Sequence, residues 1–337
     1  MSDRIIHASI HEFQKQDDGF FRSSEKKMIA HIVMQQINPH ILAIDLGGHN
    51  LRTALVNEQA QIIDPKRVRT HADRTPEAVI EQITAEVKEI VDNHPDKTIL
   101  GIGIGVPGFA STESGVIYSS PNFPTWKNTA IKKELEERLP FPVIVENDAN
   151  AAALGEYWCG KGKGAQGFVL MTLGTGVGAG IIINGEIFRG SRGAAAELGH
   201  IKIRKDGPLC GCGGTGCLET WVSGSALELE TGTKAKILYQ QALEGDQKSK
   251  DIWIEMGRRL GTALSNIAFT FDPDVIAIGG RVSQAFELFF PGIEEVFSHN
   301  LAKHPAKQTS IVLSTCWNDG GMLGMAKLGF EHFLHQP

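Results

Sequence analysis

The stretch Ile41-Leu-Ala-Ile-Asp45-Leu-Gly-Gly48 is a short apolar run that ends in an acid and a pair of glycines. A second apolar run occupies 51–56, and a turn at 58–60 leads into Gln61-Ile-Ile63. Short apolar runs separated by turn residues are typical of β-strands, and glycines between two of them allow a tight corner. Residues 41–63 are therefore predicted to form a β-meander with a glycine turn at its first corner.

The same pattern returns at 167–188. The run 167–173 leads into the turn Gly174-Thr175-Gly176, a further apolar run follows, and Asn184-Gly185 is a strong hairpin signal. Helical patterns and further strand-like segments follow each copy. We therefore expect an α/β protein of two similar halves that face a cleft.

Length and composition narrow the class of protein. The chain has 337 residues, which is enough for two domains and a large core. Of these residues, 42% are hydrophobic and 21% are charged, as is ordinary for a globular protein. No apolar run approaches the roughly 20 residues of a membrane span, and the N-terminus lacks the apolar segment of a secretory signal. A formal net charge of −6 argues against a general nucleic-acid binder. We expect a cytoplasmic protein without membrane or nucleic-acid partners.

Residues 1–40 are expected to be an N-terminal helical extension. A helical apolar stripe over 28–37 follows Ser23-Ser24, a suitable N-cap. This helix would pack on the body of the protein or on a second subunit. The segment is too short for a DNA-binding helix-turn-helix domain.

A cluster of metal-ligand residues lies between Glu197 and Glu219. Its possible ligands are one imidazole and three thiols at offsets of 10, 2 and 5 residues: His200, Cys210, Cys212 and Cys217. They can supply the four N and S ligands of a closed tetrahedral zinc site, and the glycines between them let a short loop fold back. Both flanking acids would stay free to accept hydrogen bonds from hydroxyl groups.

A purely structural role or a disulfide fits these cysteines less well than a metal site. Three reduced Cys within eight residues, with Gly between them, would pack a core badly. A disulfide would leave one of the three thiols unpaired. Cys159 and Cys316 stand apart, and we predict that both are buried small apolar residues.

Glycine turns between strands offer backbone N–H groups to a phosphate. Gly47-Gly48 and Gly174-Thr175-Gly176 occupy equivalent places in the two halves and would hold a nucleotide from both sides. Gly279-Gly280 follows a third strand and would admit a base or ribose. Asp45, at the end of the first strand, would orient Mg²⁺ through water. Each turn alone is explained by a tight hairpin, but the acids at the strand ends favour a phosphate site.

Other nucleotide-binding patterns do not fit. Gly103-x-Gly105-x-x-Gly108 has the spacing of a dinucleotide fingerprint, which needs a helix at that point. Pro107 and the residues up to Gly115 predict a loop instead. The sequence GxxxxGK[ST] of a P-loop is absent.

Asp148 follows the short buried strand 143–145 and begins a helical pattern. At such a place an Asp often serves as a helix N-cap, which is the structural alternative here. The functional hypothesis is that its carboxylate accepts a proton from an attacking alcohol, as phosphoryl transfer requires. The side chain of Asn147 can both donate to and accept from a hydroxyl.

Taken together, these residues resemble the ROK family (repressor, open reading frame, kinase) from about residue 41 to the end of the chain. The motifs that carry the resemblance are Asp45-Leu-Gly-Gly-His-Asn50, Gly105-Val-Pro-Gly108, Pro121-Asn122, Glu146-Asn-Asp148-Ala-Asn150, Leu173-Gly-Thr-Gly-Val-Gly178, Glu197-Leu-Gly-His200 and Cys210-Gly-Cys-Gly-Gly-Thr-Gly-Cys217-Leu-Glu219. The last two are highly specific, whereas the glycine turns alone are not.

The resemblance implies a two-lobed, actin-like ATPase fold of the ribonuclease-H-like class. The first lobe would span 41–148 and be completed by a C-terminal helix at 320–337. The second would span 149–319 and carry the zinc loop.

The resemblance also implies roles for single residues. Asp148 would be the general base for a sugar 6-hydroxyl. The hydroxyls would be held by Gly108, Asn122, Asn147, Asp148, Glu197, His200 and Glu219. Zinc, bound by Cys210, Cys212, Cys217 and either ring nitrogen of His200, would shape this pocket and leave the other nitrogen free for the sugar.

Two positions depart from the family pattern. His49 replaces the Thr of Asp-x-Gly-Gly-Thr, which removes a hydroxyl expected near the nucleotide phosphates. The imidazole would then serve as a donor in its place, or ATP binding would be weaker. Ala196 replaces the Gly before Glu-x-Gly-His, which is expected to tighten that loop.

The resulting expectation is an ATP-dependent hexose kinase that uses Mg²⁺ and a structural Zn²⁺, with glucose as the first substrate. The nucleotide would contact Asp45, Gly47, Gly48, His49, Gly174, Thr175, Gly176, Gly279 and Gly280. Alternatives are an N-acetylglucosamine or N-acetylmannosamine kinase, a fructokinase, or a sugar-binding transcriptional regulator without catalysis. Family similarity implies a homodimer.

Overall fold

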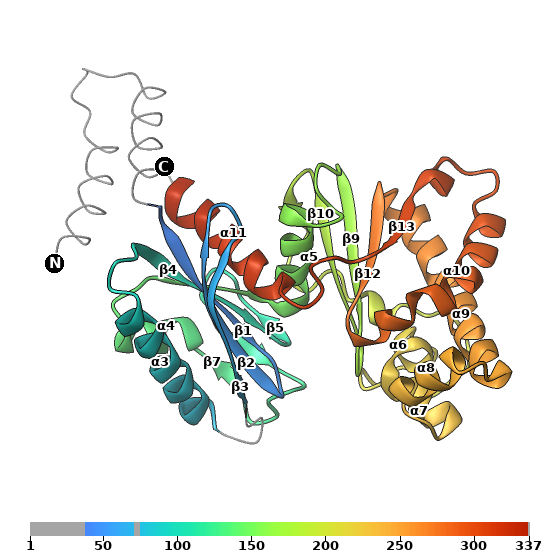
Figure 1. The fold of residues 1–337 in the computed structure, drawn as a ribbon, viewed down its shortest axis with the longest axis horizontal. Coiled ribbons are helices and arrows are strands. Elements are labelled where there is room, and N and C mark those ends of the chain that lie inside the picture. Colours follow the sequence, from blue (N-terminus) through green and yellow to red (C-terminus); the bar gives the residue numbers. More distant parts are fainter. Residues whose placement is uncertain (1–37, 71–74, 336–337) are drawn as a thin grey trace, which may run out of the picture. The chain divides into compact units, whose positions relative to one another are not determined.

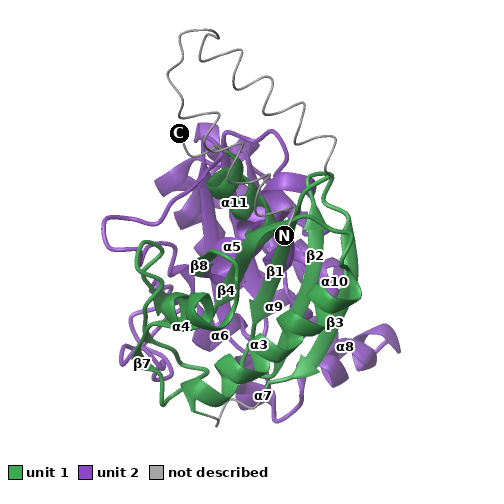
Figure 2. Cartoon of the chain, turned by 90° about the vertical axis from the view of Figure 1, so that its left-hand side faces the viewer, with its two compact units in different colours: residues 1–146, 325–337 green, residues 147–324 purple. Residues whose placement is uncertain are grey.

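The computed structural model describes residues 38–70 and 75–335 (Figure 1). The helix expected within residues 1–40 lies outside this range. The chain divides into two compact units, coloured in Figure 2. Unit 1 runs up to Glu146 and resumes at Met325, and unit 2 spans Asn147–Gly324. Each unit has its own cluster of buried apolar side chains.

Unit 1 is built on a five-stranded sheet of order β3-β2-β1-β4-β8. The first three strands are the predicted meander, paired antiparallel, and β4 pairs parallel with β1. The bounds are β1 His40–Leu46, β2 Asn50–Asn57, β3 Ile62–Arg69, β4 Ile99–Val106 and β8 Val143–Asn147. The third strand extends beyond the predicted end at Ile63. Residues 64–69 contain no apolar run, and alternate side chains among them face solvent, so the sequence pattern did not mark them as a strand.

Two helices and a small sheet complete the first part of unit 1. Helix α3 (Pro76–Asn93) begins where Thr75 accepts a hydrogen bond from the Ala78 backbone N–H, and one apolar face of the helix is buried. Helix α4 spans Ile131–Arg138. The small sheet contains β5 (Phe109–Ala110), β6 (Ile117–Ser119) and β7 (Lys127–Thr129). The residues directly after Gly108 form the short strand β5 and not a helix, which excludes a dinucleotide-binding fingerprint at this point.

Unit 2 repeats the arrangement with a sheet of order β11-β10-β9-β12-β13. Strands β9, β10 and β11 form an antiparallel meander, and β12 pairs parallel with both β9 and β13. The bounds are β9 Gly167–Leu173, β10 Val177–Ile183, β11 Glu186–Ile187, β12 Val275–Gly279 and β13 Ser310–Leu313. The two sheets therefore share one topology, as the repeated sequence pattern predicts.

The helices of unit 2 follow a simple order along the chain. Helix α5 spans Asp148–Cys159, and short 3₁₀ turns cover Leu198–His200, Arg281–Ala285 and Pro305–Gln308. The remaining helices are α6 Glu219–Val222, α7 Gly224–Thr231, α8 Ala235–Leu243, α9 Gln247–Phe271 and α10 Phe286–Asn300. Helices α9 and α10 pack closely because Gly257 has no side chain: a Cβ there would lie 1.9 Å from the Phe289 carbonyl oxygen.

A buried carboxylate ties α5 to the segment that follows β13. Glu156 is 1% exposed. It accepts hydrogen bonds from the backbone N–H groups of Lys161, Thr315 and Cys316 and from two hydroxyls, those of Ser314 and Thr315. Burial raises its pKa, but these donors stabilise the charged form and bring the pKa below its usual value.

The prediction that the two isolated cysteines are buried is wrong. Cys159 is exposed and Cys316 is intermediate in exposure. Cys159 is the last residue of α5, and Cys316 lies in the segment after β13.

Helix α11 (Gly320–His335) starts in unit 2 and ends in unit 1. Within unit 1 it lies directly on β4, since a Cβ at Gly103 would be 2.7 Å from the Met325 carbonyl oxygen. A Cβ at Gly101 would be 2.4 Å from the ring of Phe333. Gly103, one of the three glycines that have the spacing of a dinucleotide fingerprint, is thus explained by the packing of α11 on β4.

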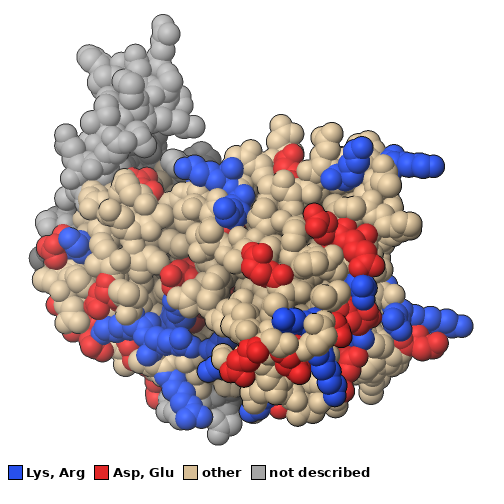
Figure 3. All heavy atoms as spheres, turned by 45° about the vertical axis from the view of Figure 1, so that its right-hand side comes forward, with Lys and Arg blue, Asp and Glu red and all other residues tan. Residues whose placement is uncertain are grey.

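Acidic and basic side chains are both spread over the face drawn in Figure 3. Such a mixed surface agrees with a modest formal net charge of −6. In the described part of the chain, no helix combines the length and apolar character needed to cross a membrane.

The contact between β4 and α11 yields a stability prediction. Gly103→Ala should lower the free energy of unfolding by about 1–3 kcal/mol, because the new methyl group meets a backbone carbonyl that cannot rotate away. Urea unfolding measures the change. Gly211→Ala is the matched control, since nothing lies within 4 Å of its added Cβ. Equal unfolding midpoints for the two variants would contradict the close packing.

Candidate functional site

Asp148 is the first residue of α5, and Asn147 is its N-cap. The side-chain oxygen of Asn147 accepts hydrogen bonds from the backbone N–H groups of Ala149 (2.9 Å) and Asn150 (3.1 Å). Asn147 is therefore the N-cap, and the Asp148 carboxylate also accepts a hydrogen bond from the Ala149 N–H, at 2.9 Å. The half-buried Asp148 carboxylate lies in the first turn of the helix.

The N-terminal part of α5 packs on β10 through glycines. A Cβ at Gly178 would lie 3.4 Å from Ala149 Cβ, and one at Gly180 would lie 2.5 Å from Ala153 Cβ. Only a strand without side chains at these two positions allows the helix to come so near. The residue after Asp148 is thereby held against the start of β10.

The segment containing His200 approaches the start of β10 as well. A Cβ at Gly199 would lie 2.3 Å from the Val177 carbonyl oxygen, so the 3₁₀ turn Leu198–His200 rests on the strand backbone. The Glu219 carboxylate accepts a hydrogen bond from the Val177 backbone N–H at 2.9 Å. Within unit 2, the start of β10 thus contacts the neighbours of Asp148 and His200, and Glu219 itself.

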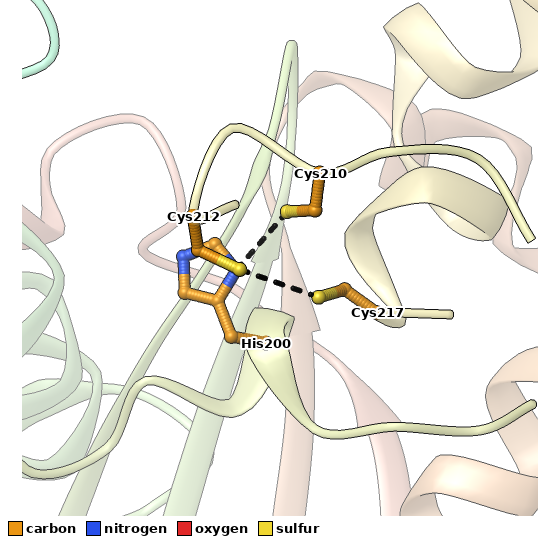
Figure 4. Close-up of side chains that lie close together, drawn as sticks. All are labelled: His200, Cys210, Cys212 and Cys217. Atoms are coloured by element: carbon orange, nitrogen blue, oxygen red, sulfur yellow. Dashed lines mark hydrogen bonds between the residues drawn. The ribbon is translucent and has the colours of Figure 1, made fainter. Parts of the chain in front are cut away.

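The predicted metal ligands lie together (Figure 4). The ligand atoms of His200, Cys210, Cys212 and Cys217 are all within 4.8 Å of one another. Cys210 Sγ is 3.4 Å from His200 Nδ1, and the sulfurs of Cys212 and Cys217 are 3.5 Å apart. Ligands of a tetrahedral zinc ion, at about 2.0–2.3 Å from the metal, are separated by about 3.5–3.8 Å. The four side chains fit such an ion.

The geometry distinguishes the two ring nitrogens of His200. Nδ1 faces the sulfurs, whereas Nε2 is 3.8 Å from a carboxylate oxygen of Glu197. The sequence left this choice open. A metal on Nδ1 would leave Nε2 beside Glu197, where both can contact a hydroxyl group.

The loop that carries the cysteines (residues 201–217, the cysteine loop) folds back as a small hairpin. Isolated antiparallel bridges join Lys202 to Cys217 and Leu209 to Thr215. Gly216 has φ +73°, and a Cβ there would lie 2.0 Å from the Arg204 carbonyl oxygen. Glycine is therefore required at this turn by both conformation and space.

Lys202 is a functional candidate that the sequence reasoning missed. Its Nζ donates a hydrogen bond to Cys217 Sγ at 2.7 Å. A lysine two residues after His200 carries no motif of its own. Only the pairing of the two hairpin strands shows that its ammonium group meets the sulfur of Cys217.

The thiols differ in their acidity. Burial raises the pKa of Cys210 to about 12, whereas a hydrogen bond from the Gly214 backbone N–H lowers the pKa of Cys212. A metal ion would have to displace the proton of Cys210, as metal binding by thiols generally does.

The pKa of one neighbouring acid, Glu197, is also shifted. Burial raises the pKa of Glu197; the His200 imidazole opposes this shift and the Glu219 carboxylate adds to it.

The predicted nucleotide turns of unit 2 are adjacent. The Gly174 N–H donates to the Gly176 carbonyl at 2.9 Å, which closes the turn between β9 and β10 (residues 174–176, the β9–β10 turn). Gly279 pairs with Thr172 across the sheet, and a Cβ at Gly280 would lie 2.4 Å from the Leu173 carbonyl oxygen. Gly280 has φ +85°, so no other residue suits this corner. Thr175 is exposed at the tip of the turn.

The remaining predicted site residues belong to unit 1. Gly47, Gly48 and the exposed His49 form the turn between β1 and β2. A Cβ at Gly48 would lie 2.6 Å from the side-chain nitrogen of Asn122, so two expected ligand sites are neighbours. Gly108 has φ +97° and lies against the Ser119 carbonyl oxygen.

Arg52 is a second residue that the sequence reasoning missed. It is paired with Asp45 across the β1–β2 ladder, and its Nη1 is 3.9 Å from the Asp45 carboxylate. A guanidinium at the end of β1 adds positive charge beside the Gly47-Gly48 turn, as an anion site requires. Strand pairing, which a linear motif does not record, brings it there.

Comparison with known proteins gives a consistent result. Residues 41–331 match the ROK family. A glucokinase of Streptomyces coelicolor is 33% identical over 314 residues, which cover 86% of this chain and 97% of that protein. The crystal structure of a ROK family glucokinase from Streptomyces griseus in complex with glucose and AMPPNP is 32% identical with a TM-score of 0.74, covering 86% of this chain and 98% of the other.

A relative of another kind is also similar. The xylose repressor of Caldicellulosiruptor bescii is 31% identical over 291 residues, which cover 79% of this chain and 72% of the repressor. The fold is thus shared by catalytic and regulatory proteins.

The backbone at Ala196 yields a second stability prediction. Its φ of +65° is left-handed, a conformation that costs a residue with a side chain about 1–2 kcal/mol. Ala196→Gly should therefore stabilise the protein by about 1 kcal/mol, after the larger entropy of an unfolded glycine is subtracted. Thermal unfolding measures the shift. Ala195→Gly is the control and should be neutral or destabilising; an equal gain in both variants would show that the left-handed backbone is not the cause.

Proposed function

This chain belongs to the ROK family, and we propose that it is a glucokinase that transfers the γ-phosphoryl group of ATP to the 6-hydroxyl of glucose. The observation that carries the proposal is the gathering, around the first residues of β10, of an acid at a helix start and a metal-ligand histidine flanked by glutamates. Similarity to glucokinases over 86% of the chain supports the choice of sugar and nucleotide.

Asp148 is the proposed general base. Its carboxylate would accept the proton of the 6-hydroxyl as the oxygen attacks the γ-phosphorus and the bond to the ADP oxygen breaks. The Ala149 N–H donates to the carboxylate at 2.9 Å, and the Ala149 side chain packs against Gly178, which helps to fix the place of the carboxylate. Phosphoryl transfer asks little more of a protein than such positioning and charge stabilisation.

The sugar hydroxyls are assigned to side chains that can donate and accept. These are Asn122, Asn147, Glu197, the Nε2 atom of His200 and Glu219, and the backbone of Gly108 is assigned with them. Glu197 and His200 Nε2 already face one another, as two groups that share one hydroxyl would.

The nucleotide is assigned to the glycine corners predicted from the sequence. These are the β9–β10 turn and Gly279-Gly280, which are adjacent. Asp45, Gly47, Gly48 and His49 are assigned to the nucleotide as well. The Asp45 carboxylate fits a water-mediated contact to Mg²⁺, an ion that would neutralise phosphate charge when bound.

Zinc is assigned to His200 Nδ1, Cys210, Cys212 and Cys217, and its contribution would be structural. The four ligands close the cysteine loop and fix the orientation of the His200 ring, so that Nε2 is presented to the sugar.

A second candidate function is a sugar-binding regulator without turnover. Similarity to a xylose repressor and the exposed His49 at the position of the expected Thr favour it. Amino-sugar kinases and fructokinases are alternatives within the enzymes. The expected homodimer, cytoplasmic location and absence of a nucleic-acid partner stay predictions.

The function is tested by an ADP-coupled assay over glucose, N-acetylglucosamine, N-acetylmannosamine and fructose. Glucose should have the largest kcat/KM. In Asp148→Asn, kcat should fall by about 10²–10⁴-fold, because the amide cannot accept the proton, while glucose should still raise the melting temperature.

Two results of this assay would contradict parts of the proposal. Near-normal turnover of Asp148→Asn would remove Asp148 as the base. A wild-type protein that glucose stabilises but that turns over none of the four sugars would favour the regulator.

The metal assignment makes a prediction of its own. Elemental analysis should find about one zinc per chain, and Lys202→Met should release it roughly 10-fold faster to a chromogenic chelator, because the ammonium no longer donates to the Cys217 thiolate. Lys205→Met is the control, since it removes the same charge from the same loop. Equal release from both variants would mean that the Lys202 contact does not stabilise the metal.

A further inference from the structure

We propose that the Glu219 carboxylate couples the cysteine loop to the β9–β10 turn, so that the state of the metal site sets the affinity for nucleotide. This inference rests on the proposed function and extends it. Glu219 would then be a positioning residue for the phosphate site, in addition to any contact with sugar.

One carboxylate oxygen of Glu219 fixes the end of the turn. It accepts the Val177 backbone N–H at 2.9 Å, and Val177 directly follows Gly176. A Cβ at Gly176 would lie 2.4 Å from the same oxygen, so only glycine leaves room for the carboxylate. The last peptide of the β9–β10 turn is thereby oriented by Glu219.

The other carboxylate oxygen lies at the cysteine loop. It is 3.7 Å from Cys210 Sγ. Glu219 also follows Cys217 by two residues and begins α6. A change at either sulfur would therefore move the carboxylate or the start of the helix that carries it.

The opposite end of the turn is held by the same segment of chain. The Gly224 backbone N–H donates to the Gly174 carbonyl oxygen at 2.7 Å, at the start of α7. Residues 219–224 thus clamp the turn at both ends, through Glu219 to Val177 and through Gly224 to Gly174. Because this clamp begins directly after the cysteine loop, an ordered loop orders the turn.

The consequence concerns nucleotide affinity. Backbone N–H groups bind a phosphate well only when they are held in one orientation before the phosphate arrives. A carboxylate that only held sugar hydroxyls would leave the nucleotide affinity of the sugar-free protein unchanged. The coupling role predicts that it changes.

The test is calorimetric titration with AMPPNP and Mg²⁺ in the absence of sugar. Glu219→Ala should weaken binding about 10-fold, as the loss of a hydrogen bond to a charged group implies. Glu219→Gln should stay within about threefold of wild type, because its amide oxygen can still accept the Val177 N–H. Glu228→Ala, an exposed acid on the neighbouring helix α7, is the control.

Metal removal tests the same coupling without a substitution. Removal of zinc with a chelator, which is dialysed away before Mg²⁺ and AMPPNP are added, should weaken AMPPNP binding by the wild type. It should have little further effect on Glu219→Ala, because the connection is already broken. Should Glu219→Ala fail to fold, unchanged affinity of the chelated wild type would still overturn the inference.

The remaining outcomes separate the two claims. Folded Glu219→Ala that binds AMPPNP like wild type would overturn the inference alone. Wild type that binds no AMPPNP would overturn the proposed glucokinase function, and this inference with it.

Discussion

Close contact of three segments with the backbone at the start of β10 is the constraint on which unit 2 depends. Gly178 and Gly180 admit α5, the Val177 carbonyl meets Gly199, and the Val177 N–H donates to Glu219. Each contact needs either a missing side chain or a free backbone group. A strand backbone is rigid within its sheet. The start of β10 therefore helps to position Asp148, His200 and Glu219, which come from three distant parts of the sequence.

The cysteine loop adds a second, separate source of order. Residues 201–217 include few apolar side chains and several glycines, so burial alone stabilises them weakly. The four possible ligand atoms lie within 4.8 Å of one another, so one bound ion could hold the loop together in place of a hydrophobic core. The ammonium of Lys202 adds a charge beside a sulfur. An ion bound there would therefore make the loop rigid at the surface, beside the Nε2 atom of His200 that we assign to the sugar.

Local patterns predicted much of this fold correctly, and their failures have physical causes. The meander of 41–63 and its copy at 167–188 are present because apolar runs with glycine corners have few alternatives as strands. The sequence offered Asp148 as a possible helix N-cap, but the cap is Asn147. The backbone conformation at the end of β8 decides which of the two residues precedes the first helical turn. The prediction that Cys159 is buried failed because the sequence does not show which side of a helix end faces solvent.

By itself, the sequence determined the repeated strand pattern, the grouping of one histidine with three cysteines and the family, since each depends on residue types at short, fixed spacings. Only the tertiary structure decided that Nδ1 of His200 faces the sulfurs, that Lys202 meets Cys217, and that Glu219 accepts the Val177 N–H. These facts depend on which backbones approach one another, and that is decided by packing between segments far apart in the chain.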